Sequence, residues 1–214
     1  MSCNSVITIS REFGSGGREI ASKLAERLNV DFYDKELIYL AAKKSGIDPS
    51  VFEKIDERAS NSLLYSLSMG MFNFGQTGFS PDDQISVNDQ LYLIQYEIIR
   101  KLAKNPCVIV GRCADYILKD LPNCISVFIH ADFDLRCERA ARVRNISDSN
   151  IAAVVRKADK FRSNYYRFYT EQKWGLPKNY NLTVNSGRLS VSQTADLIAE
   201  YVRIFETESS VNTI

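Results

Sequence analysis

The sequence predicts an α/β fold, with a parallel sheet and flanking helices. Three observations predict it. A β-branched run over residues 6–10 leads through Gly14, Gly16 and Gly17 into helical spacing, which is a strand, a glycine turn and a helix. The continuous apolar run at 107–110 is typical of a parallel strand buried on both faces. Strand-like and helix-like segments then alternate along the chain, which favours crossover connections between parallel strands.

The first elements follow from local patterns. A helix is expected over residues 17–28, because Ile20, Leu24 and Leu28 recur at helical spacing. An extended piece at 30–34 precedes a helical pattern at 35–44, and Asp34 stands where a capping residue is preferred. Asp34 also lies only one strand away from the glycine turn, so a ligand-binding role stays open. Pro49 is expected to begin a further helix that runs to about residue 58.

Residues 60–83 break this regular pattern. Three glycines alternate there with bulky apolar side chains, and no helical or strand period is visible. Such a segment is either a flap over a site or part of a subunit interface. The sequence leaves both interpretations open, including a homo-oligomer formed through this segment.

The second half begins with an amphipathic helix expected at 87–104 and the buried strand at 107–110. Arg112 follows that strand. It is either a surface arginine at a turn or a ligand-binding group, since open α/β sheets bind ligands at the carboxyl edge of their strands. A helix at 114–119 and a second buried strand at 125–129 complete another repeat.

Residues 132–171 are expected to form two arginine-rich helices joined near Asn145, with Asp148 as the cap of the second. Arg136, Arg139 and Arg142 share one helical face, and few acidic residues stand nearby in the sequence. They form either a solvated face or a set of unpaired cations that bind an anion. An edge-near strand at 180–185 and a closing helix at 192–205 end the pattern.

Composition narrows the function classes. With 214 residues and 45% hydrophobic content, the chain suits one domain. A net charge of +1 argues against a broadly basic nucleic-acid binder and favours small partners. The five cysteines are odd in number and contain no C-x-x-C pair, which indicates reduced thiols. No apolar run reaches the roughly 18 residues of a membrane span, so we expect a cytoplasmic protein without membrane contact.

The glycine turn is the strongest candidate site. Glycines let main-chain N–H groups approach a ligand, and the following helix adds the positive end of its dipole, so such a turn binds phosphate. In the usual loop, G-x-x-x-x-G-K-[ST], a lysine and a hydroxyl follow the last glycine. Here Gly17 and Arg18 stand at those positions, and Arg11 stands at the first glycine.

The turn is therefore either a plain glycine-rich connection or a variant phosphate loop with arginine charges. Two arginines beside one turn favour the variant loop, and of the two we expect Arg18 to contribute more than Arg11.

The chain resembles the cytidylate kinase-like family, a branch of the P-loop nucleoside monophosphate kinases. Five motifs in the same order carry the resemblance. They are Ile7–Ala21, Phe32–Ile38, Val110–Tyr116, Asp159–Tyr166 and Trp174–Gly175.

The resemblance implies a single P-loop kinase-like domain over residues 1–214. Its core would comprise residues 1–34, 85–131 and 173–214, with an acceptor-binding insertion at 35–84 and a lid at 132–172. It also implies ATP as the phosphoryl donor, Mg²⁺ between the donor phosphates, and a nucleoside monophosphate such as CMP or dCMP as the acceptor.

The resemblance assigns roles by position. The donor phosphates would lie against Gly14, Ser15, Gly16 and Gly17. The acceptor would be bound by Arg112, Asp159 and Arg162, and the catalytic cations Arg136 and Arg139 would close over the transferring phosphoryl group. The residues themselves add Arg18 and Arg11 as catalytic cations, with Arg18 also beside the donor phosphates, and Asp34 as a candidate for binding the acceptor. No residue is assigned to the metal.

Three positions depart from the family pattern: Gly17 replaces the loop lysine, Cys113 replaces an acid after Arg112, and Leu40 replaces an arginine after Tyr39. Three function classes therefore stay open. The protein is a small-molecule kinase, a nucleotide-binding regulatory protein with little or no kinase activity, or an oligomeric interaction protein.

Overall fold

The computed structural model describes residues 3–34, 87–144 and 150–211. The expectations for residues 35–86 lie outside these ranges, including both helices there and the segment at 60–83. The chain divides into two compact units, one formed by residues 1–35 with 99–214 and the other by residues 36–98. Apart from the first part of α5 (Val87–Leu102), all the elements below belong to the first unit.

A five-stranded parallel sheet in the order β2-β3-β1-β4-β5 forms the centre of this unit. The strands are β1 (Val6–Arg11), β2 (Asp31–Tyr33), β3 (Cys107–Val110), β4 (Cys124–His130) and β5 (Leu182–Asn185). Ile9 of β1 pairs with Val110 on one side and with Val127 on the other. Because all strands are parallel, their carboxyl ends meet at one edge, where Arg11 and the residue after β3, Gly111, come together.

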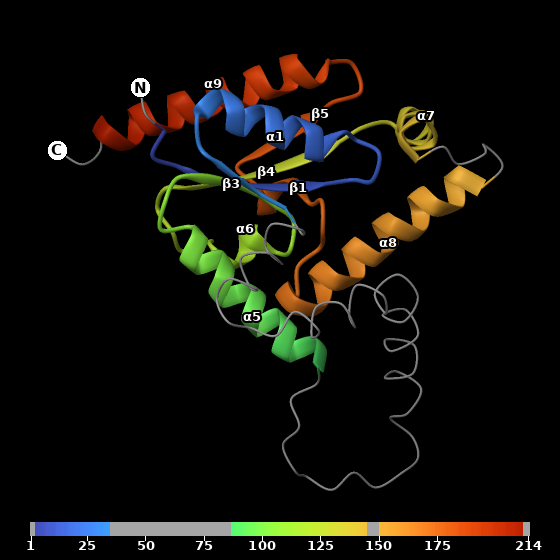
Figure 1. Ribbon diagram of the computed structural model, residues 1–214, viewed down its shortest axis with the longest axis horizontal. Helices are drawn as coiled ribbons and strands as arrows, with labels where there is room; N and C mark the ends of the chain where they lie inside the picture. The colour runs from blue at the N-terminus through green and yellow to red at the C-terminus, as the bar shows by residue number, and fades with distance from the viewer. Residues whose placement is uncertain (1–2, 35–86, 145–149, 212–214) are drawn as a thin grey trace, which may run out of the picture. The chain divides into compact units, whose positions relative to one another are not determined.

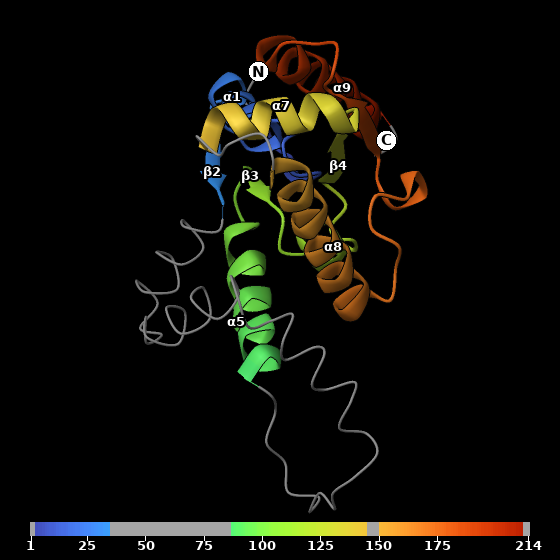
Figure 2. The ribbon, with the colours of Figure 1, turned by 90° about the vertical axis from the view of Figure 1, so that its right-hand side faces the viewer.

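Helices cover both faces of the sheet, as predicted. The helices of this unit are α1 (Gly17–Leu28), α6 (Ala114–Ile117), α7 (Phe133–Arg144), α8 (Ile151–Thr170), a short 3₁₀ helix (Pro177–Asn179) and α9 (Val191–Val211). Helices α1 and α9 pack side by side on one face, and α6 and α8 lie on the other (Figures 1 and 2). None of the described helices is both long and apolar enough to cross a membrane.

The main core lies between the sheet and the helix pair α1 and α9. Ile20 and Leu24 of α1 are fully buried there, together with Ile198 of α9. Burying one such side chain contributes about 1.5–3 kcal/mol, so the amphipathic pattern at 17–28 explains why α1 stays on the sheet. The strands supply Ile7, Ile9, Val108, Val110, Ile125, Val127, Ile129 and Val184 to the same core.

The structure differs from two of our expectations about the later helices. Helix α9 extends to Val211, beyond the expected end at 205. The expected cap of α8 was wrong, because the residue before its first turn is Asn150, which makes no side-chain capping hydrogen bond. Asp148 itself lies outside the described residues. All five cysteines are free thiols, as expected.

A buried carboxyl group links α6 to α8 on the second face of the sheet. The Asp115 side chain accepts a hydrogen bond of 2.7 Å from the Tyr166 hydroxyl, and both residues are buried. Burial raises the pKa of Asp115 from 3.8 to about 6, and the Tyr166 hydrogen bond acts in the opposite direction.

The raised pKa predicts a pH dependence of stability. Between about pH 4 and pH 6 the unfolded chain releases the Asp115 proton while the folded chain keeps it. The contribution is therefore present at low pH and lost as pH rises through 6, by at most about 3 kcal/mol. Asp115→Asn removes this titration and can still accept the Tyr166 hydrogen bond. We expect the variant to gain about 2 kcal/mol relative to the unaltered protein between pH 4.5 and pH 7.5, measured by urea unfolding.

The exposed Asp120, at the end of the same segment, provides the control. Asp120→Asn should show no such drift. An equal stability difference for Asp115→Asn at both pH values would contradict the prediction.

Candidate functional site

The glycine turn lies at the carboxyl edge of β1, as the sequence predicted. Gly14 and Gly16 have φ values of +81° and +78°, a left-handed conformation that glycine adopts without strain. Gly16 directly precedes α1, and its carbonyl accepts the hydrogen bond of Ile20 N–H at 3.0 Å. The N–H groups of the first helical turn have no partners within a helix, so this end of α1 suits an anion.

The turn is in close contact with α7, which explains its glycines. A Cβ atom on Gly14 would overlap the backbone carbonyl of Arg136, and one on Gly16 would overlap the guanidinium of Arg139. The Arg139 guanidinium also donates a hydrogen bond of 2.7 Å to Glu19 in the first turn of α1. Arg139 therefore lies directly over the turn. We expected a catalytic cation there from the sequence.

Arg136 binds several groups of the protein through its Nε and Nη1 atoms. Its Nε lies 3.1 Å from the Glu12 carboxylate, and its Nη1 donates to the Asp159 carboxylate and, at 3.0 Å, to the Phe13 carbonyl. The other Asp159 oxygen accepts the Phe13 N–H at 2.7 Å. The Arg136 residue is 7% exposed. Arg136 and Asp159 thus hold the backbone on which the glycine turn is built.

The expectation that these arginines have too few acidic partners was wrong. Arg136 pairs with Glu12 and Asp159, and Arg139 pairs with Glu19. Glu12 directly follows β1, Asp159 lies on α8 and Glu19 on α1, so these acids are distant in sequence from the arginines. Spacing within one helix could not reveal them.

The turn is also held from β5. The Ser15 hydroxyl donates to the Glu12 carbonyl at 2.9 Å, which turns this side chain into the protein. The Ser15 carbonyl accepts a 2.7 Å hydrogen bond from the Ser186 hydroxyl, which lies just beyond β5. Ser186 was not predicted from the sequence. Its place directly after the last predicted strand was a signal, because that position must reach the same edge of the sheet.

A cluster of arginines lies beside the turn. Burial, together with the charges of Arg162 and Arg112, lowers the pKa of Arg11 to about 9. The Arg162 guanidinium donates to the Arg11 carbonyl at 2.8 Å. Arg18 is near as well and forms an ion pair of 2.6 Å with Asp34. At neutral pH these guanidinium groups are charged, so this edge attracts an anion.

The backbone that carries Arg112 is unusual. Gly111, Arg112 and Cys113 have consecutive φ values of +77°, +60° and +57°. Outside glycine, such a conformation costs of the order of 1–3 kcal/mol per residue and is found where function maintains it. Arg112, the middle one of the three, is the residue to which the family resemblance assigned the acceptor's phosphate.

The structure thus brings most of the predicted site residues to one edge of one unit. Those at the edge are Arg11, Gly14, Ser15, Gly16, Gly17, Arg18, Asp34, Arg112, Arg139 and Arg162. Arg136 and Asp159 adjoin them but bind the protein backbone. In the described ranges, no group of three or more His, Cys, Asp or Glu side chains could hold a metal, so no ligand of Mg²⁺ is assigned.

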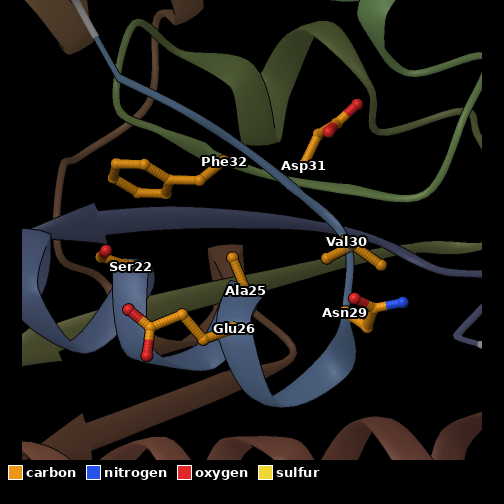
Figure 3. Close-up of a pocket in the computed structure, with 7 residues that line it drawn as sticks. All are labelled: Ser22, Ala25, Glu26, Asn29, Val30, Asp31 and Phe32. Carbon is orange, nitrogen blue, oxygen red and sulfur yellow. The ribbon is translucent and has the colours of Figure 1, made fainter.

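A separate pocket of about 280 Å³ lies elsewhere (Figure 3). It opens between the C-terminal part of α1 and β2, and its lining includes Glu26, Asn29 and Phe32. Among the described residues, no arginine and no member of the glycine turn lines it. This pocket is therefore distinct from the candidate phosphate site.

Comparisons with known proteins show the family and the fold of this chain. A family model described as the cytidylate kinase-like family matches residues 6–188. An uncharacterized protein from Eubacterium ventriosum ATCC 27560 shares 31% identity and has a TM-score of 0.70, over 94% of this chain and 99% of that chain. No functionally curated protein matches.

Two kinases of known structure are similar in fold. The shikimate kinase from Acinetobacter baumannii in complex with shikimate shares 16% identity, with a TM-score of 0.52 over 94% of each chain. A gluconokinase from Sinorhizobium meliloti 1021 shares 12% identity, with a TM-score of 0.53 over 98% of each chain. Likeness at this identity shows the fold alone, which is the P-loop kinase fold.

Proposed function

This chain belongs to the cytidylate kinase-like family, and on that premise we propose that it transfers a phosphoryl group from ATP to a small acceptor such as CMP or dCMP. One observation carries the proposal. The amino end of α1 and the charges of Arg11, Arg112 and Arg162 gather at one edge of the sheet. Catalysis of phosphoryl transfer consists mainly of positioning and of neutralising phosphate charge, which is what such an arrangement supplies.

The donor phosphates bind over the backbone of the glycine turn in this proposal. Gly14, Gly16 and Gly17 let the turn pack closely against neighbouring arginines, and one of these, Arg139, lies beside Gly16, near the group that moves. Mg²⁺, when bound with ATP, would supply further positive charge at this edge. Arg136 is assigned a positioning role, because its hydrogen-bonding groups hold the turn.

The acceptor binds on the other side of this edge. Arg112 takes its phosphate, Arg162 adds a second cation, and Asp34 accepts hydrogen bonds from polar groups of the acceptor. Asp159 supports the turn that the acceptor faces. Residues 132–172 act as a lid, although the contacts of Arg136 tie the start of α7 to the turn.

A second function is favoured by the loop itself. Gly17 replaces the loop lysine and Arg18 is paired with Asp34, so a protein that binds nucleotide as a regulator with little turnover also fits these residues. The free thiols fit the reducing cytoplasm in which we place the protein. An assembly through residues 60–83 remains a prediction outside the described structure.

Turnover of ATP with a panel of acceptors tests the proposal. The panel contains CMP, dCMP, UMP and AMP, together with shikimate and gluconate because kinases of similar fold are named for them. Arg112→Met should lower kcat/KM for the best acceptor about 10- to 100-fold, since it removes a charge-assisted contact worth about 1.5–3 kcal/mol. Arg203→Met is the control, because Arg203 is exposed on α9 and pairs with Glu200.

The outcomes separate the candidate functions. Turnover with one acceptor that depends on Arg112 supports the kinase. Binding of ATP without turnover of any acceptor would favour the regulatory protein. If ATP produces no thermal shift at all, both nucleotide functions fail.

A further inference from the structure

The stem of Arg11 fills the space that a side chain at position 17 would need. A Cβ atom on Gly17 would lie 2.6 Å from the Cβ and 2.8 Å from the Cγ of Arg11. Both distances are shorter than carbon atoms tolerate without movement. The two Arg11 atoms are close to the backbone of β1, so they cannot swing aside as the end of a long side chain can. A lysine at position 17 is therefore incompatible with the Arg11 side chain as it lies here.

The rest of Arg11 runs from the donor side of the edge toward the acceptor side. Its guanidinium lies against Gly111, where a Cβ atom would overlap its Nη1. It thereby passes from the glycine turn to the strained backbone that carries Arg112. Within the described residues, no acidic side chain forms an ion pair with Arg11, and Asp34 acts on it only through longer-range attraction.

Arg18, which the sequence favoured for this role, lies differently. Its Nε donates to Asp34 at 2.6 Å, and its side chain is 64% exposed. Part of its charge is thus already balanced by a carboxylate. The Arg11 side chain, in contrast, extends from the glycine turn to Gly111 and so connects the donor side with the acceptor side.

We infer that Arg11 supplies the charge that a lysine at position 17 supplies in the usual phosphate loop, and that the two side chains exclude each other. The glycine at 17 is then a requirement of the arginine at 11. A guanidinium in this place can bind two phosphate oxygens at once, whereas an ammonium acts as a point charge. This inference rests on the proposed function, because it assigns the cation of the same site.

Exchange of the two residues tests the inference. The variants are Arg11→Gly, Gly17→Lys, and the double exchange Arg11→Gly with Gly17→Lys. A second double variant, Arg11→Ala with Gly17→Lys, keeps the Cβ atom that collides with position 17, so it is the matched control. ATP affinity is measured by calorimetry, and turnover is measured with ATP and the best acceptor. Thermal unfolding checks that each variant folds.

We expect the variants to differ in a defined order in ATP affinity and turnover. Arg11→Gly should weaken ATP binding about 10-fold and lower kcat about 100-fold, since arginine contacts in phosphoryl transfer are worth at least this much. The double exchange should recover about 10-fold or more of both losses, and the control carrying alanine should not. Arg18→Ala should have a smaller effect than Arg11→Ala.

Any one of three results would overturn the inference. The first is that Arg11→Gly keeps ATP affinity and turnover within about twofold of the unaltered protein. The second is equal recovery in the two double variants, and the third is a larger effect of Arg18→Ala than of Arg11→Ala. If the unaltered protein binds ATP but transfers no phosphoryl group, the proposed kinase function fails while the order of ATP affinities still decides this inference. Without ATP binding by the unaltered protein, both fail.

Discussion

Replacing Gly16 with valine is expected to weaken ATP binding by about three orders of magnitude. Residue 16 has φ +78°, a conformation that a β-branched side chain opposes, and its Cβ would overlap the Arg139 guanidinium. The change therefore displaces Arg139 and fills the space over the first N–H groups of α1. Loss of two charge-assisted hydrogen bonds to phosphate, each worth about 1.5–3 kcal/mol, corresponds to roughly 100- to 10,000-fold in affinity.

The experiment needs a control for backbone strain alone. Gly175 has φ +73° and lies on the loop after α8, where a Cβ would approach the Phe128 ring at 3.0 Å. Gly175→Ala and Gly16→Ala should cost similar stability in thermal unfolding, but only Gly16→Ala should weaken ATP binding. Unchanged ATP affinity in a folded Gly16→Val or Gly16→Ala variant would place the nucleotide elsewhere.

Replacing Arg136 with methionine is expected to lower the free energy of unfolding by about 3–5 kcal/mol, even without nucleotide. Methionine keeps much of the apolar stem but leaves two partly buried carboxylates, Glu12 and Asp159, without their cation. Removal of one partner from a buried ion pair has this cost, because the remaining charge stays desolvated. The turn should loosen as well, since the Phe13 carbonyl loses its donor.

Urea unfolding measures this effect, with Arg156→Met as the matched control. Arg156 is exposed on α8 and lies over the Phe133 ring at 4.4 Å, so its loss should cost less than about 1 kcal/mol. A stable Arg136→Met variant that only loses turnover would instead favour the original expectation of a lid arginine at the transferring phosphoryl.

The sequence predicted the fold and the place of the glycine turn because both depend on local patterns. The β-branched run, the glycines and the helical spacing lie within residues 6–28, and their helix begins at Gly17 and ends at Leu28 as expected. The contacts of Arg136 could not be predicted in this way, since Glu12 and Asp159 meet it only after distant segments pack. The choice between Arg11 and Arg18 likewise depended on the direction of each side chain, which no spacing encodes.

The central place of β1 has a consequence for the order of folding. Its neighbours in the sheet, β3 and β4, begin at Cys107 and Cys124, so β1 can pair only after about half of the 214-residue chain has been synthesised. Contacts so distant in sequence make folding slow, because the entropy of closing long loops must be overcome before the sheet is stabilised. A nascent chain that has only residues 1–100 holds the complete glycine turn but none of the strands that flank it. The candidate site is therefore complete only late in folding, when Arg162 reaches the Arg11 carbonyl.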